Sequence, residues 1–280
     1  MKVIIGIDVG GSTTKIVGFR VDGDKRELIE PQFVKAGDPV TSTYGAFGKF
    51  TDENRISMNS IEKIMMTGVG SSYVKRDLYG LESVRVPEFS AIGSGGIYLS
   101  GLSETLVVSM GTGTAMVRAS TTGKMDYLGG TGVGGGTLVG LSRLLLSADT
   151  VAHVEEYAKE GQLANIDLRI KDITPKDAKA VLSEELTASN FGNVSDLASK
   201  EDVAKGILNM VYETVGMMSI FAARSTGVDN IVLTGNLTRL DFCREKFDFF
   251  NSMRDTYGMN FIIPRRAEYA TAIGTALFGL

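Results

Sequence analysis

The chain has 280 residues, 43% of them hydrophobic, and its 29 basic and 33 acidic residues leave a formal net charge of −4. This is enough apolar material for one large or two small domains, and the lack of a basic block predicts that no nucleic acid is bound. Cys243 is the single cysteine, which excludes an internal disulfide and fits a reducing cytoplasmic compartment.

No membrane-spanning segment is predicted. The most apolar long stretch, residues 203–223, contains Lys205, Asn209 and Glu213, so we expect it to be a buried helix. A strand pattern starts at Val3, with no secretory signal before it. These features predict a soluble cytoplasmic protein.

Hydrophobic alternation and turn residues divide the first hundred residues into strands and helices. In order, these are strands at 3–8, 15–21 and 27–36, a helix at 40–54, a strand at 61–67, helical spacing at 72–78, a short strand in SVRVPEF and a glycine-rich helix in SAIGSGGIYLSG. The Asp-Gly turn in VDGDK joins the second and third strands as a hairpin. Residues 1–102 are predicted to form one α/β domain.

The second half begins with the same kind of pattern. In order, we expect a strand, a glycine turn and a returning strand in ETLVVSMGTGTAMVRAS, a hairpin turn in TTGKM, a glycine-rich loop entering a helix in GGTGVGGGTLVGLSRLLLS, a long helix at 200–224, a strand at 230–236, a further helix, the strand NFIIP and the closing helix AEYATAIGTALFG. Residues 103–265 are predicted to form a second domain, and residues 266–280 to pack back onto the first.

A strand, a polar glycine turn and a returning strand thus occur twice, at residues 5–15 and 107–117. Two such hairpins, far apart in the chain, indicate duplicated α/β domains with a cleft between them.

The first glycine turn combines phosphate-binding and metal-binding chemistry. Glycine lets the backbone approach a ligand closely, and small hydroxyl side chains add donors without bulk. Asp8, a carboxylate at the end of the strand, repels phosphate oxygens but is suited to hold Mg²⁺ or its waters. The candidate phosphate-binding residues are Gly10, Gly11, Ser12, Thr13, Thr14 and, as a point charge, Lys15.

Two common nucleotide loops are excluded. The G-x-x-x-x-G-K-[ST] spacing of a Walker loop is missing, and GVGGG at residues 132–136 lacks the strand context of a Rossmann fingerprint. Any single glycine turn could equally be an ordinary hairpin or bulge. Four polar glycine segments on two similar halves, DVGGSTTK, MGTGTA, GVGGGT and LTGN, favour a phosphate and metal platform.

These segments resemble the actin, hexokinase and Hsp70 superfamily of two-domain phosphotransferases. IIGIDVGGSTTK resembles its first phosphate motif, LVVSMGTGTAMV the second, NIVLTGN the adenosine motif and ATAIGTAL the last connecting helix. The resemblance implies two actin-like (ribonuclease H-like) α/β domains with a nucleotide cleft between them. More narrowly, VPEFSA, GGTGVGGGTLVGLSRLL and LTASNFGNV resemble the type II pantothenate kinases.

The narrower resemblance implies a function. It implies phosphorylation of pantothenate to 4'-phosphopantothenate with ATP and Mg²⁺, the first step of coenzyme A biosynthesis. It also implies a homodimer that pairs through the long helix. The apolar segment ILNMVYETVGMMSIFAA supports the homodimer, because a monomer seldom exposes so much hydrophobic surface.

The resemblance also assigns roles to residues. Glu88, in VPEF, matches the general base that takes the proton of the attacking hydroxyl, although a glutamate after a proline could also be an ordinary surface residue. Lys15 is the second catalytic candidate. The residues matched to nucleotide binding are Thr112 and Gly113 in the second phosphate loop, Gly135, Gly136 and Thr137 at a helix start, and Asn236 near the nucleoside.

One position departs from the family. Type II kinases usually have an arginine just before the valine of an RVGG segment, at the pantothenate side of the cleft, and here MDYLGG places Tyr127 there. A phenol can donate a hydrogen bond to a carboxylate but cannot neutralise its charge. Either another basic residue compensates, or the acceptor differs from pantothenate, or the activity is weak.

Other functions share part of this pattern. A kinase of another small alcohol or sugar would more often use an aspartate base, which we do not find, and a nucleotide-binding pseudokinase would not need Asp8, Lys15 and Glu88. ATPase activators of 2-hydroxyacyl-CoA dehydratases carry a segment like GIDVGGSTTK, but they hold a [4Fe–4S] cluster with two cysteines per subunit. Cys243 is expected in the core and His153 at the surface, so neither is assigned a catalytic role.

Overall fold

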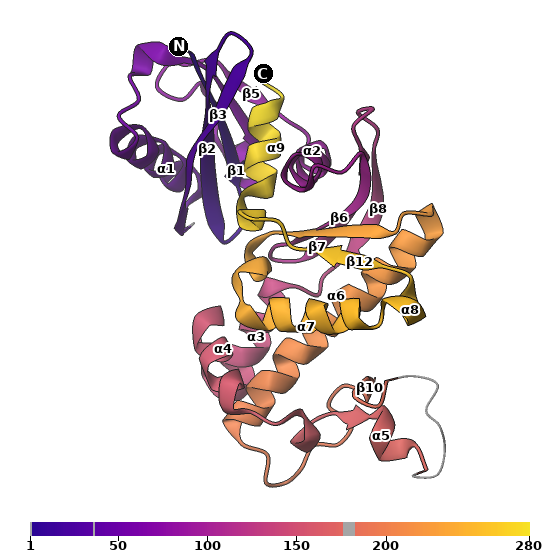
Figure 1. The fold of residues 1–280 in the computed structure, drawn as a ribbon. Helices are drawn as coiled ribbons and strands as arrows, with labels where there is room; N and C mark the ends of the chain where they lie inside the picture. Colours follow the sequence, from indigo (N-terminus) through magenta and orange to yellow (C-terminus); the bar gives the residue numbers. More distant parts are fainter. Residues whose placement is uncertain (1, 36, 176–182) are drawn as a thin grey trace.

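The computed structural model describes residues 2–35, 37–175 and 183–280. Two five-stranded sheets form the centres of two lobes, one above the other in Figure 1, and helices cover both. The N-terminus lies in the first lobe, and the C-terminal helix returns to it (Figure 1). The predicted pair of α/β domains is therefore present.

The first sheet has the strand order β3-β2-β1-β4-β5. Its strands are β1 (Lys2–Val9), β2 (Thr13–Asp22), β3 (Lys25–Lys35), β4 (Ile61–Thr67) and β5 (Ser83–Arg85). The first three form an antiparallel meander, whereas β4 pairs parallel to β1 and β5 parallel to β4. Helix α1 (Pro39–Glu53) packs Phe47 and Phe50 against one face of this sheet.

The second sheet repeats this plan in the order β12-β11-β6-β7-β8. Its strands are β6 (Glu104–Met110), β7 (Thr114–Ser120), β8 (Met125–Thr131), β11 (Asn230–Thr234) and β12 (Asn260–Ile262). Strands β6 to β8 form an antiparallel meander, whereas β11 pairs parallel to β6 and β12 parallel to β11. The internal repeat read from the two hairpins is confirmed, although residues 129–131 extend β8 where a loop was expected.

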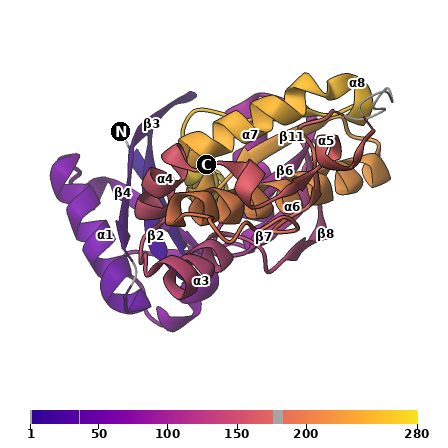
Figure 2. The same cartoon turned by 90° about the horizontal axis from the view of Figure 1, so that it is seen from below.

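Helices lie on one side of the second sheet (Figure 2). They are α3 (Gly135–Leu146), α4 (Val151–Glu160), α6 (Lys200–Thr226) and α7 (Asp241–Ser252). Helices α6 and α7 lie against the strands, and α3 and α4 pack on α6. By length and composition alone α6 could cross a membrane, the one such helix among the described residues, but 67% of its most apolar window is buried. It is a core helix, as predicted.

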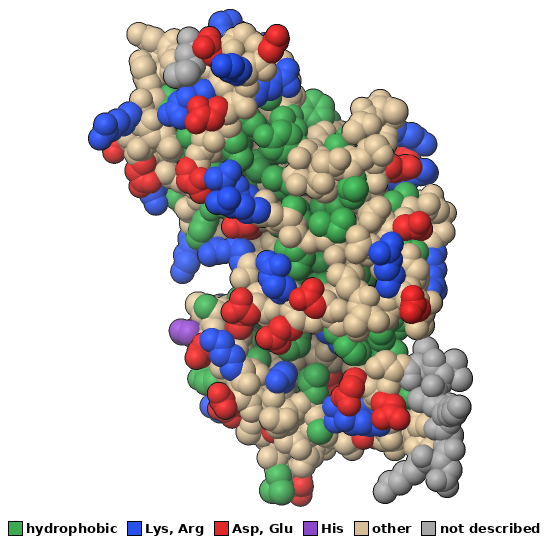
Figure 3. Space-filling view, in the orientation of Figure 1, with side chains coloured by type: hydrophobic (Ala, Val, Ile, Leu, Met, Phe, Trp, Pro, Cys, Tyr) green, Lys and Arg blue, Asp and Glu red, His purple; other side chains and the backbone are tan. Residues whose placement is uncertain are grey.

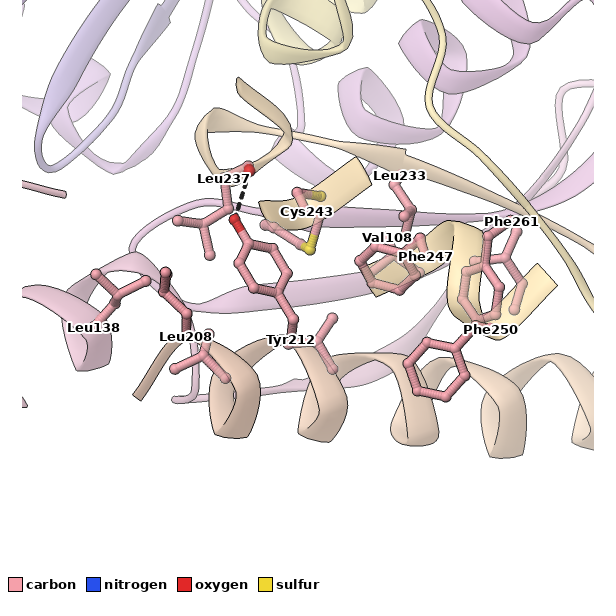
Figure 4. Close-up of a cluster of buried hydrophobic side chains, with 14 of the residues drawn as sticks. Val108, Leu138, Leu208, Tyr212, Leu233, Leu237, Cys243, Phe247, Phe250 and Phe261 are labelled. Carbon is pink, nitrogen blue, oxygen red and sulfur yellow. Dashed lines mark hydrogen bonds between the residues drawn. The ribbon is translucent and has the colours of Figure 1, made fainter. Parts of the chain in front are cut away.

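The core beneath the second sheet is rich in aromatic residues (Figure 4). Tyr212 of α6 is fully buried, and its hydroxyl donates a 2.7 Å hydrogen bond to the carbonyl oxygen of Leu237. Phe247 and Phe250 of α7 pack beside Phe261 of β12. Cys243, on the same helix, is also fully buried, as the sequence predicted.

The polar residues of α6 are paired inside the protein. The Lys246 ammonium donates to Asn209 at 2.7 Å and to Glu213 at 2.9 Å. Asn209 in turn donates to Asp167 at 2.7 Å. Buried polar groups are tolerated when they are hydrogen-bonded in this way, which explains how a helix with these residues can be a core helix.

Two helices, one from each lobe, cross and pack against each other, and this contact joins the lobes. Helix α2 (Glu88–Ser100) packs on the second sheet, on the face opposite α6, while α9 (Ala270–Leu277) packs on the first sheet against β1 (Figure 1). Their backbones touch at two glycines: a β-carbon on Gly95 would lie 1.9 Å from the carbonyl oxygen of Ala270, and one on Gly274 would lie 1.9 Å from that of Ala91.

Substituting alanine for Gly95 is therefore expected to destabilise the protein by about 1–3 kcal/mol, the usual effect of overpacking. Gly45, an exposed helical glycine of α1 with open space around it, provides the matched control. Gly45→Ala should be neutral or stabilising by up to about 1 kcal/mol because alanine is the better helix former. Urea unfolding compares the two, and equal stability of both variants would contradict the helix contact.

The remaining elements are short. They are α5 (Ile170–Ile173), α8 (Arg254–Tyr257), β9 (Leu168–Arg169), β10 (Thr187–Ser189), and the 3₁₀ helices η1 (Met58–Ser60), η2 (Val69–Tyr73), η3 (Leu163–Asn165), η4 (Asn236–Arg239) and η5 (Ala267–Tyr269). On the face shown in Figure 3, basic and acidic side chains are interspersed over both lobes. The surface there has the mixed charge that the sequence indicates.

The helix predicted at residues 72–78 is wrong. The chain forms η2 and then an irregular segment, although Val74 and Leu78 are buried at helical spacing. The Arg85 guanidinium donates to the carbonyl oxygens of Ser71 and Val74, at 3.3 and 3.1 Å. A tertiary contact thus takes carbonyl groups that a helix would have used.

Candidate active site

A cavity of about 520 Å³ lies between the two lobes. It is lined by the loops that follow β1 and β6, the first turn of α2, β8 and the residues after it, η4, and the start of α9. The predicted site residues that line it are Asp8, Gly10, Gly11, Ser12, Thr13, Lys15, Glu88, Thr112, Gly113 and Asn236. The structure therefore brings most of the candidates from both halves of the chain into one place.

The two glycine turns face each other across this cavity. In the first, the Gly10 amide donates to the carbonyl oxygen of Thr13 at 3.0 Å, and in the second the Gly111 amide donates to that of Gly113 at 2.9 Å. A β-carbon on Gly11 would lie 3.7 Å from the Thr112 hydroxyl oxygen. The two turns therefore come close to each other at this point.

Asp8 and Lys15 form a buried pair on the floor of the cavity. They are register partners on β1 and β2, and Lys15 Nζ lies 4.0 Å from Asp8 Oδ2. Burial raises the pKa of Asp8, and Lys15 partly offsets this rise. Burial also lowers the pKa of Lys15, against the attraction of Asp8 and Glu268. In both groups desolvation outweighs the attraction between the charges.

The signs of these shifts give a stability prediction. The native pKa of Asp8 is raised, so its contribution to the free energy of unfolding is lost as the pH rises through that pKa. The native pKa of Lys15 is lowered, so its contribution is lost as the pH falls towards that pKa. When both groups are charged, the desolvation of the pair therefore opposes folding. The double variant Asp8→Asn/Lys15→Met should raise the free energy of unfolding, by about 1–4 kcal/mol if it behaves as other buried ion pairs do.

The control is the exposed pair of Lys2 and Glu62, which lies 2.9 Å apart at the starts of β1 and β4 in the same sheet. Lys2→Met/Glu62→Gln should change stability by less than about 1 kcal/mol, because surface pairs contribute little. Chemical denaturation at neutral pH measures the free energy of unfolding of both double variants. A loss of stability in the Asp8/Lys15 double variant would show that attraction, and not desolvation, dominates the pair.

Glu88 lies at the first position of α2, where its carboxylate faces the cavity. The segment before it is fixed, because the Thr67 hydroxyl of β4 donates to the carbonyl oxygen of Val86 at 2.9 Å. Partial burial in the cavity wall raises the pKa of Glu88, and the negative charge of Asp8 raises it further. A carboxylate of raised pKa in a cleft has the character of a general base.

Asn236 connects the two lobes. At the start of η4, its side-chain amide donates a 3.0 Å hydrogen bond to the hydroxyl of Thr13 in the first glycine turn. Further contacts lie beside it: the Arg239 guanidinium lies 4.7 Å from the centre of the Phe33 ring, and Arg266 forms an ion pair with Glu30. Both lobes therefore contact each other at this side of the cavity.

Thr14 requires a correction. Its side chain is fully buried, and its hydroxyl oxygen lies 3.0 Å from that of Ser42 on α1. Successive side chains of a strand point to opposite faces, so Thr13 and Lys15 reach the cavity and Thr14 cannot. The hydroxyl of Thr14 holds α1 to the sheet instead.

Three further candidates, Gly135, Gly136 and Thr137, do not line the cavity. The amides of Gly135 and Gly136 donate to the carbonyl oxygens of Gly111 and Thr112, at 2.9 and 2.8 Å. The Thr137 hydroxyl donates to the carbonyl oxygen of Gly132 at 2.8 Å. This helix start therefore supports the second glycine turn, and its amides are already used.

Several lining residues were not assigned to the site from the sequence, and Ser109 and Thr271 are two of them. Ser109 and Thr271 both reach the cavity, from the end of β6 and the start of α9. Each is a hydroxyl residue in an apolar segment, LVVSM and ATAIGTAL, and that contrast was the available signal. Their position at the cavity depends on how the two lobes meet, which no local pattern shows.

The two five-stranded sheets, each a meander extended by parallel strands, and the glycine turns between them define an actin-like ATPase fold. A solved structure described as the activator of the 2-hydroxyisocaproyl-CoA dehydratase from Clostridium difficile with bound ADPNP is similar, with a TM-score of 0.66 over 99% of this chain and 93% of that chain. The sequence identity of 17% means that the fold alone is shared. The predicted actin-like fold is confirmed.

The chain belongs to the type II pantothenate kinase family. The family model described as Fumble matches residues 97–277. A type II pantothenate kinase of Oceanobacillus iheyensis is 33% identical over 98% of each chain, and one of Staphylococcus aureus (strain USA300) is 28% identical over 83% of this chain and 84% of its own. The resemblance found in the motifs is thus confirmed.

The likeness to the dehydratase activator does not extend to a cluster site. Cys243 is fully buried beneath the second sheet, and burial raises the pKa of its thiol far above the ordinary value. A thiol held protonated in a core does not ligate iron, since the ligand is the thiolate. No group of three or more His, Cys, Asp and Glu side chains suited to a metal occurs in the described part of the chain.

Proposed function

We propose that this protein transfers the γ-phosphoryl group of ATP to the primary hydroxyl of pantothenate, giving 4'-phosphopantothenate and ADP in the first step of coenzyme A biosynthesis, in the cytoplasm. The observation that carries the proposal is that Glu88, the Asp8–Lys15 pair and both glycine turns line one cavity. The type II pantothenate kinases at 33% and 28% identity supply the acceptor.

The role of Glu88 follows from its position on the cavity wall. As the acceptor oxygen forms its bond to the γ-phosphorus, the bond from that phosphorus to the leaving oxygen of ADP breaks, and the hydroxyl proton passes to the Glu88 carboxylate. Its raised pKa makes the ionised Glu88 carboxylate a better proton acceptor than that of an ordinary glutamate.

The phosphate groups are held by the two facing turns. Ser12, Thr13 and Thr112 line the cavity, where their backbone amides and hydroxyls would donate to phosphate oxygens, and Lys15 would add a positive charge. Positioning and charge stabilisation are the main contributions that a protein makes to phosphoryl transfer.

Asp8 fits Mg²⁺. Its carboxylate reaches the cavity, and its nearest cation, Lys15, lies 4.0 Å away, too far for a hydrogen bond. Mg²⁺ usually takes one or two protein carboxylates and completes its shell with phosphate oxygens and water. Asp8 would hold the ion, which neutralises charge on the phosphates when bound.

The experiment is a kinase assay with the purified protein, ATP, Mg²⁺ and pantothenate. We expect ADP release that depends on pantothenate, and a product heavier than pantothenate by one phosphoryl group in mass spectrometry. ATP binding without phosphorylated product would indicate a pseudokinase. Phosphorylation of a sugar or another alcohol, but not of pantothenate, would show that the acceptor is wrong.

The proposal includes a homodimer. The argument from α6 is weaker than its composition indicates, because most of its apolar side chains, including Val211 and Val215, are fully buried in the protomer. Phe221, 59% exposed, and the half-buried Met217 remain on its outer side. Sedimentation at micromolar concentration should give twice the 30.0 kDa of one chain, and a value of one chain would reject the dimer.

A further inference from the structure

Thr67, the last residue of β4, continues the row of the buried pair on the cavity floor. It is the register partner of Asp8 on β1, and Asp8 is the register partner of Lys15 on β2. Register partners on neighbouring strands present their side chains on the same face of a sheet. The next residue, Gly68, passes so close that a β-carbon on it would lie 2.8 Å from Asp8 Oδ1. The end of β4 thus lies directly beside the Asp8 carboxylate.

The side chain of Thr67 is used inside the protein. It is 1% exposed and does not line the cavity. Its hydroxyl donates to the carbonyl oxygen of Val86 at 2.9 Å, and the Val86 amide donates to the carbonyl oxygen of Met66 at 2.8 Å. Both backbone polar groups of Val86 are therefore bound by the end of β4.

Little freedom remains between Val86 and Glu88. Pro87 lies between them, with a φ of −57°, and Glu88 is the first residue of α2. A proline ring fixes φ, and the residue before a proline is confined to extended conformations. Holding the carbonyl group of Val86 therefore also holds Glu88.

This connection matters because Glu88 and Asp8 are carried by elements that pack in different lobes. Helix α2 packs on the second sheet, whereas Asp8 and Lys15 lie in the first. The Thr67 hydroxyl ties the start of α2 to the strand beside Asp8. A displacement of about 1 Å between reacting groups can cost on the order of 10²-fold in rate, so such a tie has consequences for turnover.

We infer that Thr67 is a positioning residue for phosphoryl transfer, which acts through Val86 to hold the Glu88 carboxylate in register with the row of Asp8 and Lys15. The inference rests on the proposed function. Thr67 touches no reacting group, because its hydroxyl is bound to the backbone on the far side of the cavity wall. Its removal should therefore lower turnover without weakening the binding of ATP.

The test compares Thr67→Val with Thr67→Ser. Valine keeps the branched shape and removes the donor, so kcat for pantothenate should fall on the order of 10- to 100-fold. The Kd for ATP should stay within about twofold, because Asp8, Lys15 and the glycine turns are unchanged. Serine restores the donor and should recover most of the lost kcat.

The pH profile separates positioning from a general loss of stability. Partial burial and the charge of Asp8 raise the pKa of Glu88. A Glu88 released from the wall meets more water, so the acid limb of kcat/KM in Thr67→Val should shift towards the ordinary glutamate value of about 4.3. In Thr67→Ser the limb should stay where it is in the unmodified enzyme.

Thr105 supplies the matched control. It is a fully buried strand threonine whose hydroxyl donates to the carbonyl oxygen of Asn230 at 2.8 Å, at the end of β6 away from the cavity. Thr105→Val should lower the urea midpoint of unfolding and leave kcat and the acid limb unchanged. Pro87→Ala, at an exposed position, loosens the same link without emptying a buried contact. It should also lower kcat at constant ATP affinity, which decides the question if Thr67→Val folds poorly.

The outcomes distinguish this inference from the proposed function. Native kcat with an unshifted acid limb in Thr67→Val, or native kcat in Pro87→Ala, would overturn the inference and leave the kinase function intact. A loss that serine does not restore, or an equal loss in Thr105→Val, would do the same, since packing would then explain it. Phosphorylation of no acceptor by the unmodified enzyme would overturn the proposed function, and this inference with it.

Discussion

Replacing Glu88 by glutamine is expected to lower kcat for pantothenate on the order of 10²- to 10⁴-fold, the usual loss when a general base is removed. Glutamine keeps the size of the side chain and cannot accept the hydroxyl proton. The affinity for ATP should stay nearly unchanged, because Glu88 is on the helix that follows β5, on the cavity wall with Tyr127 and Ile92. Steady-state kinetics and a nucleotide Kd separate the two effects.

The pH profile provides a second measurement on the same residue. The base works only when ionised, so activity should fall as the pH drops through the pKa of Glu88. Burial and Asp8 raise that pKa, so the acid limb of kcat/KM should lie above the ordinary glutamate value of about 4.3. In the Glu88→Gln variant this limb should disappear from the residual activity.

Glu82 supplies the control for Glu88. It is exposed just before β5, 3.7 Å from Lys63, and does not line the cavity. Glu82→Gln should therefore keep both kcat and the pH profile. Near-native turnover of Glu88→Gln with pantothenate would show that another group takes the proton, and that the role carried over from the family does not hold here.

Replacing Asp8 by asparagine should lower the activity by a different route, through the binding of Mg²⁺ and ATP. The neutral amide no longer anchors Mg²⁺, so we expect kcat/KM for ATP to fall on the order of 10²- to 10³-fold, as when one charge-stabilising group leaves a preorganised site. The variant should also need more Mg²⁺ for half-maximal rate. Glu88→Gln should not share this second effect, because Glu88 acts on the acceptor.

Asp22 is the matched control, since it is exposed at the far end of the same hairpin. Asp22→Asn should leave the Mg²⁺ dependence and the ATP kinetics as they are. Titrating Mg²⁺ at fixed ATP, and ATP at saturating Mg²⁺, measures the anchoring directly. An Asp8→Asn enzyme with an unaltered Mg²⁺ requirement would refute the metal role of Asp8.

Much of the fold and most of the site could be predicted from the sequence. The strand–turn–strand segments at 5–15 and 107–117 became the two meanders, because alternating apolar residues and glycine turns act through local geometry. Asp8 and the glycine turns were found from their residue types at the strand ends, whereas Glu88 was found through the resemblance of VPEF to a family motif. At residues 72–78 the predicted helix was wrong, because the Arg85 guanidinium binds the backbone carbonyl oxygens of Ser71 and Val74.

The sequence by itself therefore determined the elements, the repeat and the chemistry of the candidate residues, since these depend on neighbours in the chain. Only the tertiary structure decided which candidates share the cavity. It placed Thr14 on the far face of β2, used the amides of Gly135 and Gly136 within the protein, and stacked Phe89 on Tyr127. These outcomes depend on strand alternation within a formed sheet and on contacts between segments far apart in the chain, which acquire a geometry only when the two lobes pack together.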